Sequence, residues 1–340
     1  MEGERHSMIY APVCIITLNR YEHLKGLIES LQQNSWAQYT DLYIGLDFPP
    51  SEKYEEGYKK IVQYLGGGIH GFQKVHVIKR NRNIGAAKNA SLMIEEVLKR
   101  FDRFIFFEDD NIVSVDFLEY MDKCLDYFYE DKRVNMIGGY TNTLLENSVD
   151  DSEANIFAIH DGNAWGWGTW EENWQRMVKE INREYFEAAV CDIRKLRKIK
   201  YKKSLYKLID YLSTDQEIPF QDSTINIYMQ LNDMCKILPT STKVLNHGWD
   251  GTGVNCGVND SYLAQKMKED QGSFSLRISS GLMDAKSISE NDSIMQKADK
   301  YSIDARRWIW LIMFCIFTPK RAKKWRAVWK KMKKRVRGKY

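Results

Sequence analysis

Apolar positions occur in blocks along the first third of the chain. Apolar runs lie at 13–18, 42–46, 75–78 and 104–107, and segments with helical spacing lie between them at 21–33, 54–65 and 84–100. Short runs of this kind are typical of strands buried on both faces of a sheet. Strands that alternate with helices imply right-handed crossovers. The pattern therefore predicts an α/β fold, with a Rossmann-like, mostly parallel sheet flanked by helices.

Polar residues follow three of these predicted strands. Arg20 comes shortly after the first, Asp47 directly after the second, and Glu108, Asp109 and Asp110 directly after the fourth. In a parallel sheet the carboxyl ends of the strands lie at one edge, which is where α/β proteins bind ligands. We therefore expect these side chains to converge, although some sixty residues separate Asp47 from the three acids.

The pattern changes after residue 111. It predicts a helix at 116–129, a short strand at 134–137, a loop rich in glycine and tryptophan at 161–170, helices up to about residue 232 and a strand near 243–245. Residues 258–304 are rich in Ser, Asp and Lys and are predicted to be surface loop and linker. We expect one main domain over 1–257, the linker over 258–304 and a basic tail over 305–340.

Charge is distributed unevenly along the 340 residues. The whole chain carries +4, but residues 305–340 hold fourteen Lys and Arg and no acid, so the preceding residues carry −10 (+4 minus 14). An acidic body argues against a general nucleic-acid-binding surface, whereas the tail is suited to one polyanionic partner. In the tail, apolar positions from Ala322 to Val336 share one helical face among lysines and arginines. This favours a helix in an anionic membrane surface, and docking on the acidic body is the alternative.

Cysteine spacing and the chain ends bear on location. The six cysteines show no CxxC or zinc-type spacing, which favours a reducing compartment over a disulfide framework. The first residues lack the apolar core of a signal peptide, and the apolar stretch 308–317 is far shorter than a membrane span. We expect a cytoplasmic protein, peripheral on the inner face of the cell membrane.

The acid cluster at Glu108, Asp109 and Asp110 is the sharpest local feature. Its hard oxygen ligands suit Mg²⁺ or Mn²⁺, which can bridge the phosphates of a nucleotide, whereas the plain alternative is an acidic turn. The sequence contains neither GxGxxG nor a P-loop, so the negative charge of a phosphate would be neutralised by such a metal and by nearby Arg or Lys side chains. Residues 80–89 are basic and begin a predicted helix, whose N-terminus would favour an anion. The alternative is an N-capped surface helix without a ligand.

Tryptophans and glycines gather at 161–170. Trp165 and Trp167 lie among glycines, a composition poor for a helix and suited to a loop. Indole rings stack on the apolar face of sugars, and packing in an aromatic core is the alternative.

Taken in order, these motifs resemble the nucleotide-sugar glycosyltransferases of the GT-A fold, especially bacterial family-2-like members, and more distantly N-acetylglucosaminyltransferase I. The resemblance covers about 12–257, with a nucleotide-binding half at about 10–111 and an acceptor half at about 112–257. It rests on the segments 12–20, 45–47, 83–85, 107–110 with 115–120, 166–170 and 220–222.

The resemblance implies a role for each matching residue. Asp110 matches the metal-binding acid, and Asp222 matches the general base of inverting members, although here Gln221 precedes it where relatives often have Trp or Asp. His247, in a glycine-rich segment, is either a further metal or diphosphate ligand or a structural histidine. The implied donor-binding residues are Arg20, Asp47, Asn83, Gly85, Glu108 and Asp109, and the basic segment 80–89 adds Lys88. The stacking argument makes Trp165 and Trp167 the expected acceptor-binding residues.

The leading hypothesis is an inverting, metal-dependent glycosyltransferase of hexosyltransferase type. It would use Mn²⁺ or Mg²⁺ to move a sugar from a nucleotide-diphosphate sugar, with UDP favoured, to a glycan acceptor. A lipid-linked acceptor in bacterial surface polysaccharide synthesis is inferred from the tail alone. The alternatives are a sugar-phosphate nucleotidyltransferase of similar fold and a non-catalytic polyanion- or membrane-binding adaptor.

Overall fold

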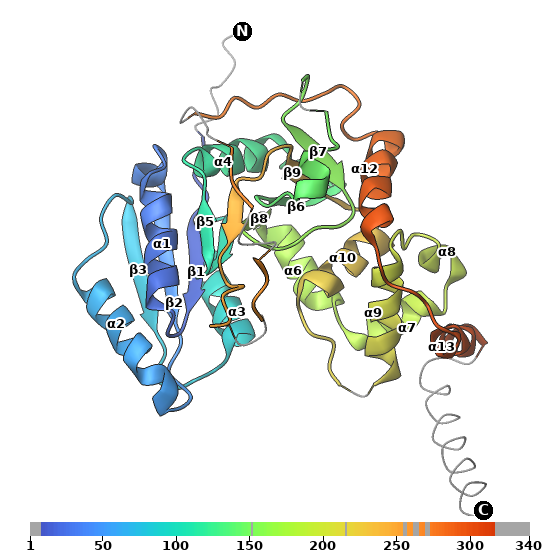
Figure 1. Cartoon of the computed structure of the whole chain (residues 1–340), viewed down its shortest axis with the longest axis horizontal. Helices are drawn as coiled ribbons and strands as arrows, with labels where there is room; N and C mark the ends of the chain where they lie inside the picture. The colour runs from blue at the N-terminus through green and yellow to red at the C-terminus, as the bar shows by residue number, and fades with distance from the viewer. Residues whose placement is uncertain are drawn as a thin grey trace, which may run out of the picture.

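A sheet of eight strands forms the centre of the protein in the computed structural model (Figure 1). The structure describes residues 8–150, 152–214, 216–253, 257–260, 265–268 and 273–316. The strand order is β3-β2-β1-β4-β8-β6-β9-β7. The bounds are β1 (Val13–Thr17), β2 (Asp41–Leu46), β3 (Lys74–Lys79), β4 (Arg103–Glu108), β6 (Val134–Gly138), β7 (Ile156–Ile159), β8 (Trp167–Trp170) and β9 (Cys235–Pro239).

The first four strands confirm the predicted parallel sheet. β1 pairs in parallel with both β2 and β4, and β2 pairs in parallel with β3. The helices α1 (Tyr21–Gln32), α2 (Glu55–Gly66) and α3 (Ala86–Val97) make the connections. Thr17 is in register with Leu46, and Ile16 with Glu108, so the carboxyl ends of β1, β2 and β4 lie side by side.

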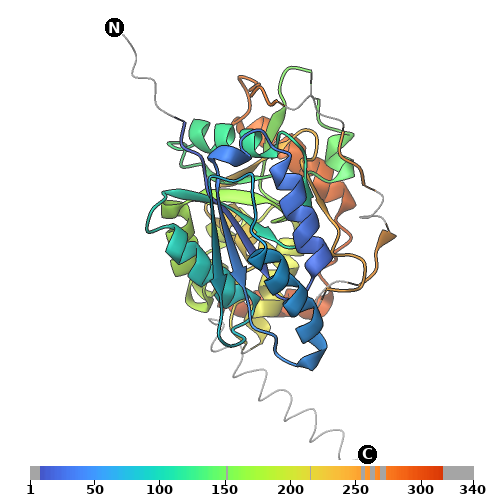
Figure 2. The same ribbon diagram turned by 90° about the vertical axis from the view of Figure 1, so that its left-hand side faces the viewer.

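Both faces of the sheet are covered, because side chains of successive strand residues point to opposite sides. Ile15 belongs to a core shared with α1 and α2, whereas its neighbours Cys14 and Ile16 belong to a second core shared with α3. Figure 2 shows α1 and α2 (blue) on one side of these strands. The α/β class predicted from the apolar blocks is therefore confirmed.

β8 lies antiparallel between β4 and β6, and it corrects one prediction. The segment 161–170 was expected to be a loop throughout, but Trp167–Trp170 forms a buried strand. Gly168 makes this possible, because a Cβ at that position would lie 3.0 Å from the backbone oxygen of Phe104 and 2.8 Å from Cε of Met121. β6 and β9 are parallel, and β7 closes the edge of the sheet antiparallel to β9.

A small second sheet lies beside the site edge. β5 (Asn111–Val113) and β10 (Val244–Asn246) pair antiparallel, with Asn111 opposite Asn246. This pairing brings the segment after residue 246 next to the acids that end β4.

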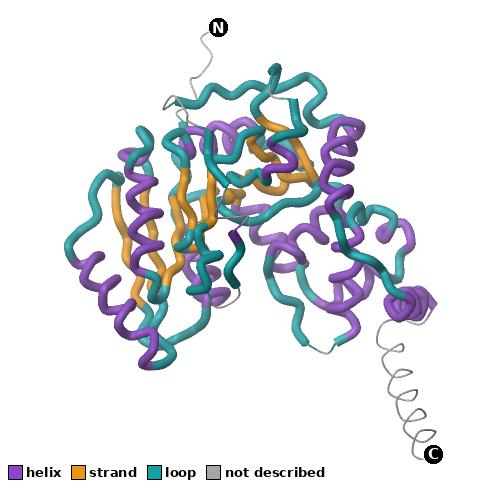
Figure 3. Tube along the Cα trace, viewed as in Figure 1, coloured by secondary structure: helices purple, strands orange, loops and turns teal. Residues whose placement is uncertain are grey.

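Most helices after β5 gather on one side of the molecule (Figure 3), whereas α4 (Phe117–Tyr127) packs on β6 and β8 of the sheet. The bounds of the other helices are α5 (Thr143–Glu146), α6 (Glu171–Glu180), α7 (Arg183–Val190), α8 (Ile193–Leu196), α9 (Lys202–Ser213), α10 (Asp222–Leu231), α12 (Ala285–Ala298) and α13 (Ala305–Ile316). Within the described residues, no helix is both long and apolar enough to cross a bilayer.

Two predicted boundaries need correction. Part of the predicted linker at 258–304 is helix α12, which packs on β7 with Ile288 in the core. The first part of the predicted tail is helix α13, whose Trp310 and Phe314 are buried in the core that α7 and α9 share. The remaining residues of the tail, 317–340, lie outside the described residues, and the predicted amphipathic helix falls among them.

We expect Gly57→Ala to destabilise the fold where α2 meets the loop that leads to Arg20. A Cβ at Gly57 would lie 1.9 Å from the backbone oxygen of Asn19, so helix and loop must separate. Overpacking of this kind costs about 1–3 kcal/mol of unfolding free energy, measurable by urea denaturation.

Gly66→Ala on the same helix is the matched control. A Cβ at Gly66 meets nothing within 4 Å, so Ala should be neutral or stabilising by up to about 1 kcal/mol. Equal stability of the two variants would contradict the close approach of α2 to Asn19.

Candidate active site

The carboxyl ends of β1, β2 and β4 bring together the polar residues that the sequence singled out. Arg20 precedes α1, Asp47 follows β2, and Glu108 is the last residue of β4. The convergence predicted for Arg20 and the acids is observed as direct contact. One guanidinium nitrogen of Arg20 pairs with Asp109, and the other, Nη1, lies 2.8 Å from Oδ2 of Asp110.

Asp109 and Asp110 are both nearly enclosed, with 4% and 5% of their surface exposed. Thr17 Oγ1 donates to Oδ2 of Asp109 at 2.8 Å, so both oxygens of Asp109 have partners. Burial raises the pKa of Asp109, and Arg20 and the hydroxyl of Thr17 partly offset that rise. Asp109 therefore holds Arg20 in place, and its predicted contact with a donor stays a prediction.

Asp110 is also tied to the segment that follows β10. The side-chain amides of Asn246 and Asn111 each donate to its Oδ1 at 2.8 Å, and the backbone N–H of His247 donates to its backbone oxygen at 2.7 Å. A Cβ at Gly248 would lie 2.2 Å from Oδ2 of Asp110, so only glycine fits there. Sequence analysis missed Asn246 and Gly248, although both lie in the glycine-rich segment that drew attention to His247.

Glu108 is the last residue of β4, and its side chain is exposed at the edge of the sheet. Desolvation by the surrounding protein is the main cause that raises the pKa of Glu108 to about 7, and the negative charges of Asp110, Asp222 and Asp109 add to it. Asp222, from the distant helix α10, is placed beside this strand by its partner Ala164, which lies three residues before Trp167, the residue that pairs with Phe106 of β4.

Asp222 is the first residue of α10 and does not cap that helix. The cap is Gln221, whose backbone N–H donates to Oγ1 of Thr224 at 3.0 Å. The Asp222 carboxylate instead accepts the backbone N–H of Ala164 on Oδ2, at 3.0 Å. A helix-capping role therefore does not account for this acid.

Asp47 is 4% exposed and holds the turn that leads into α3. Its carboxylate accepts the backbone N–H groups of Ile84 at 3.1 Å and Gly85 at 2.9 Å, and the side-chain amide of Asn83 at 3.2 Å. Gly85 has a φ of +80°, which suits glycine. Lys88 is exposed in the first turn of α3, so four of the seven predicted donor-binding residues lie around one turn.

The two candidate acceptor-binding tryptophans differ in burial. Trp167 is 4% exposed and packs on Phe104 and Trp174, with ring centroids 5.5 and 6.2 Å away. Its predicted role in stacking on an acceptor is wrong, because the ring is part of the aromatic core. Trp165 is half-buried, packs edge-on against Tyr140 at 4.5 Å and stays a candidate.

The residues at the end of β4 are suited to a divalent cation shared with a ligand. Among the described residues, no three His, Cys, Asp or Glu side chains form a group that could hold a metal unaided. Mg²⁺ is commonly bound by one or two carboxylates together with substrate phosphates and water, and Mn²⁺ favours the same oxygen ligands. Glu108 and Asp110 offer such oxygens, and partial burial together with His23 lowers the pKa of His247, which favours its neutral, ligating form.

A cavity of about 140 Å³ lies away from this site. It is lined by Asp102, which precedes β4, and by Glu171, which follows the antiparallel β8, so it lies at the opposite edge of the sheet. It includes none of the predicted site residues.

No protein-family model matches the chain, and a search of curated proteins gives no match. Solved structures with a similar fold are glycosyltransferases of the GT-A type, the type that the sequence resembles. S. aureus TarS with UDP-GlcNAc is 12% identical over 69% of this chain and 58% of its own, with a TM-score of 0.39. GalNAc-T7 with UDP, GalNAc and Mn²⁺ is 12% identical over 76% and 47%, with a TM-score of 0.44. The mannosyltransferase PcManGT from Pyrobaculum calidifontis, with GDP-Man and Mn²⁺, is 11% identical over 51% and 47%, with a TM-score of 0.36.

The chain spans less than two thirds of the length of each of these structures.

We expect Arg20→Met to destabilise the protein in a pH-dependent way. Loss of one partner of a buried ion pair costs about 3–5 kcal/mol, because the remaining charge is left without compensation. The enclosed carboxyls would then bind protons in the folded state at pH values where the unfolded chain does not. Stability of the variant should therefore fall as pH rises.

Unfolding free energies of parent and variant at pH 5 and pH 8 test this expectation, and the deficit should be larger at pH 8. Lys25→Met, on the exposed side of α1, is the control and should change stability by less than about 1 kcal/mol. An Arg20→Met protein as stable as the parent at pH 8 would contradict the pairing.

Proposed function

We propose that this protein is an inverting, metal-dependent glycosyltransferase that moves a sugar from a nucleotide-diphosphate sugar, with UDP favoured, to a glycan acceptor. One observation carries the proposal. The acid cluster at the end of β4 pairs with Arg20, while Asp222 of the separate helix α10 contacts the loop that leads into β8, the strand beside β4. The site thus contains one set of groups suited to a diphosphate and one distinct carboxylate suited to a proton.

The leaving diphosphate develops negative charge as the bond to the sugar breaks. A divalent cation, Mn²⁺ or Mg²⁺, held by Asp110 and Glu108 with His247 as a further donor, would supply positive charge against it. Arg20 is held by Asp109 and Asp110 at the same edge and adds a fixed guanidinium. Asn246 and Gly248 keep the Asp110 carboxylate oriented toward this role.

Asp222 is proposed as the general base. As the acceptor hydroxyl attacks the anomeric carbon, its proton passes to the Asp222 carboxylate while the diphosphate departs from the opposite face. The N–H of Ala164 fixes Oδ2 of that carboxylate. A single displacement of this kind needs no covalent nucleophile and inverts the configuration of the sugar.

The turn before α3 is the proposed site for the nucleoside. Asp47 is proposed to accept the N–H of a uracil ring, a role supported by its place beside Asn83 and Gly85 at the edge of the sheet. Lys88 and the N-terminus of α3 favour a nearby phosphate. Trp165, beside the loop that contacts Asp222, is proposed to stack on the acceptor glycan.

Membrane association is proposed through α13 and the residues that follow it. Trp308, Ile309 and Ile312 of this helix are 50%, 58% and 53% exposed, although its Trp310 and Phe314 are buried. Residues 317–340 add twelve Lys and Arg and no acid. An exposed apolar helix face next to so many basic residues suits binding to the anionic inner face of the cell membrane. An enzyme held at that surface would act on a lipid-linked acceptor in surface polysaccharide synthesis.

Asp222→Asn tests the proposed chemistry. The amide keeps the shape of the side chain but cannot take a proton, so UDP affinity should stay near that of the parent. The rate of UDP release from the UDP-hexose that the parent hydrolyses fastest should fall by about 10²–10⁴-fold. UDP-glucose, UDP-galactose and their N-acetylamino forms would be compared with Mn²⁺ present.

Asp233→Asn, at the end of the same helix, is the control. Asp233 has a φ of +53°, which Asn tolerates, so this variant should keep the parent rate. An Asp222→Asn enzyme with parent-like turnover would place the base elsewhere.

Replacing Trp308, Ile309 and Ile312 together by Ser should weaken membrane binding. Burial of each such side chain is worth about 1.5–3 kcal/mol, so binding to vesicles of equal parts phosphatidylcholine and phosphatidylglycerol should fall at least about tenfold. Vesicle flotation of the full chain measures this.

Val178→Ser with Leu92→Ser, at exposed apolar sites on other helices, is the control and should bind as the parent does. Undiminished vesicle binding by the triple variant would show that α13 does not contribute to membrane binding.

A further inference from the structure

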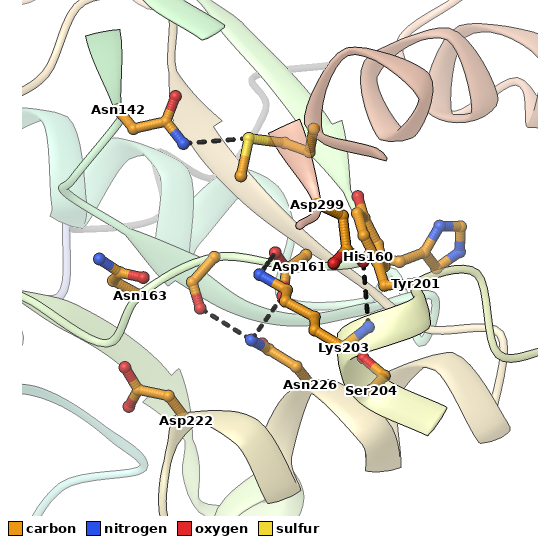
Figure 4. A network of polar contacts seen from close by, with 12 residues as sticks. Asn142, His160, Asp161, Asn163, Tyr201, Lys203, Ser204, Asp222, Asn226 and Asp299 are labelled. Atoms are coloured by element: carbon orange, nitrogen blue, oxygen red, sulfur yellow. Dashed lines mark hydrogen bonds and ion pairs between the residues drawn. The ribbon is translucent and has the colours of Figure 1, made fainter. Parts of the chain in front are cut away.

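The loop 161–164 joins β7 to the strand β8 and contacts the proposed base. It ends in Ala164, whose N–H donates to Asp222. It begins with Asp161, which is completely buried, and Gly162 has a φ of +144° that favours glycine. The position of the Ala164 N–H, and with it the orientation of the Asp222 carboxylate, depends on how this loop is held. Figure 4 shows Asp161 facing Lys203 and Asn226.

Three side chains from three different elements hold the loop. Asn226 of α10, one turn after Asp222, donates to Oδ1 of Asp161 at 2.8 Å and to the carbonyl of Gly162 at 3.0 Å. Lys203 of α9 forms an ion pair with the other oxygen, Oδ2 of Asp161.

Lys236 of β9 completes the set and is 1% exposed. Its ammonium donates to the carbonyls of Asn163 at 3.0 Å and Gly162 at 3.3 Å. Burial lowers the pKa of Lys236 to about 8, while the charges of Asp222 and Asp161 oppose that shift.

Charged groups in this place are costly, since apolar side chains would pack an interior loop at lower desolvation cost. The Lys203 side chain is 34% exposed, whereas its partner Asp161 is fully enclosed, and within the described residues Lys203 is the one cation in ion-pair contact with that carboxylate. Hydrogen bonds and ion pairs fix direction in a way that apolar contacts do not. This is what a loop needs when one of its N–H groups must aim at a reactive carboxylate.

We propose that Lys203 is a positioning residue for the Asp222 base, acting through Asp161 and the loop 161–164. Lys203 itself does not touch the substrates. The inference rests on the proposed function, in which Asp222 accepts the proton of the acceptor hydroxyl. Lys203 then sets the turnover rate through the direction of the Asp222 carboxylate, while the nucleotide, bound at the far side of the acid cluster, is unaffected.

Three variants of α9 test the proposal. Lys203→Met removes the ion pair, Lys203→Arg retains it, and Lys202→Met changes an exposed neighbouring lysine on the same helix. With Mn²⁺ and the UDP-hexose that the parent hydrolyses fastest, Lys203→Met should lower turnover at least about tenfold and change UDP affinity by less than about twofold. Lys203→Arg should restore most of the turnover, and Lys202→Met should match the parent. Parent-like turnover of Lys203→Met would overturn the proposal, as would failure of Lys203→Arg to restore it.

A double variant separates positioning from general loosening of the fold. If Lys203 acts through the base, Lys203→Met should lower turnover little further in an Asp222→Asn background. If its effect is independent, Lys203→Met should lower turnover by the same factor in both backgrounds. An equal factor in both backgrounds would overturn the proposal. Should Lys203→Met fail to fold, Asn226→Ala removes the other support of Asp161 and must show the same loss of turnover with retained UDP affinity.

The two hypotheses fail differently. An unimpaired Asp222→Asn enzyme refutes the base itself, whereas an impaired Asp222→Asn enzyme beside an unimpaired Lys203→Met enzyme refutes only the role of Lys203.

Discussion

The pairing of Arg20 with two enclosed carboxylates is the interaction on which the site depends. Asp109 and Asp110 lie at the end of a strand buried on both faces, where unpaired charges would be strongly unfavourable. Arg20 compensates both, and it can do so because β1 and β4 are parallel neighbours whose carboxyl ends coincide. The parallel sheet therefore makes an acid-rich edge tolerable, and that edge is what a metal and a diphosphate require.

Elements from distant parts of the chain complete this edge. The short pairing of β5 with β10 delivers Asn246 and Gly248 to Asp110. The loop 161–164 holds Asp222 of α10 beside β8, the neighbour of β4. The first half of the chain is thus built from regular parallel strand–helix units, whereas Asp222 is placed by a loop held by buried polar contacts.

The sequence predicts the first half well because apolar runs, helical spacing and the parallel rule all point to the same arrangement. The convergence of Arg20 with Asp109 and Asp110 follows from these alone. The strand Trp167–Trp170 was not predicted, since glycine weakens the strand preference of its tryptophans and threonine, and the partner Phe104 lies far away in sequence. Helix α12 was missed because one of its buried residues is a charged one, Asp292, which accepts hydrogen bonds from His160 and Tyr201. The contacts of Gly248 depend on a three-residue pairing that no periodicity reveals.

Calorimetric titration of UDP, with and without Mn²⁺, into the parent and into Asp110→Ala tests the central claim most directly. The account predicts that Mn²⁺ tightens UDP binding to the parent at least about tenfold, and that Asp110→Ala abolishes this gain while its thermal unfolding stays cooperative. Glu96→Ala, on the exposed face of α3, should behave as the parent does. If Asp110→Ala retains the full Mn²⁺-dependent gain, the acids that end β4 are a structural turn and the proposed donor site is wrong.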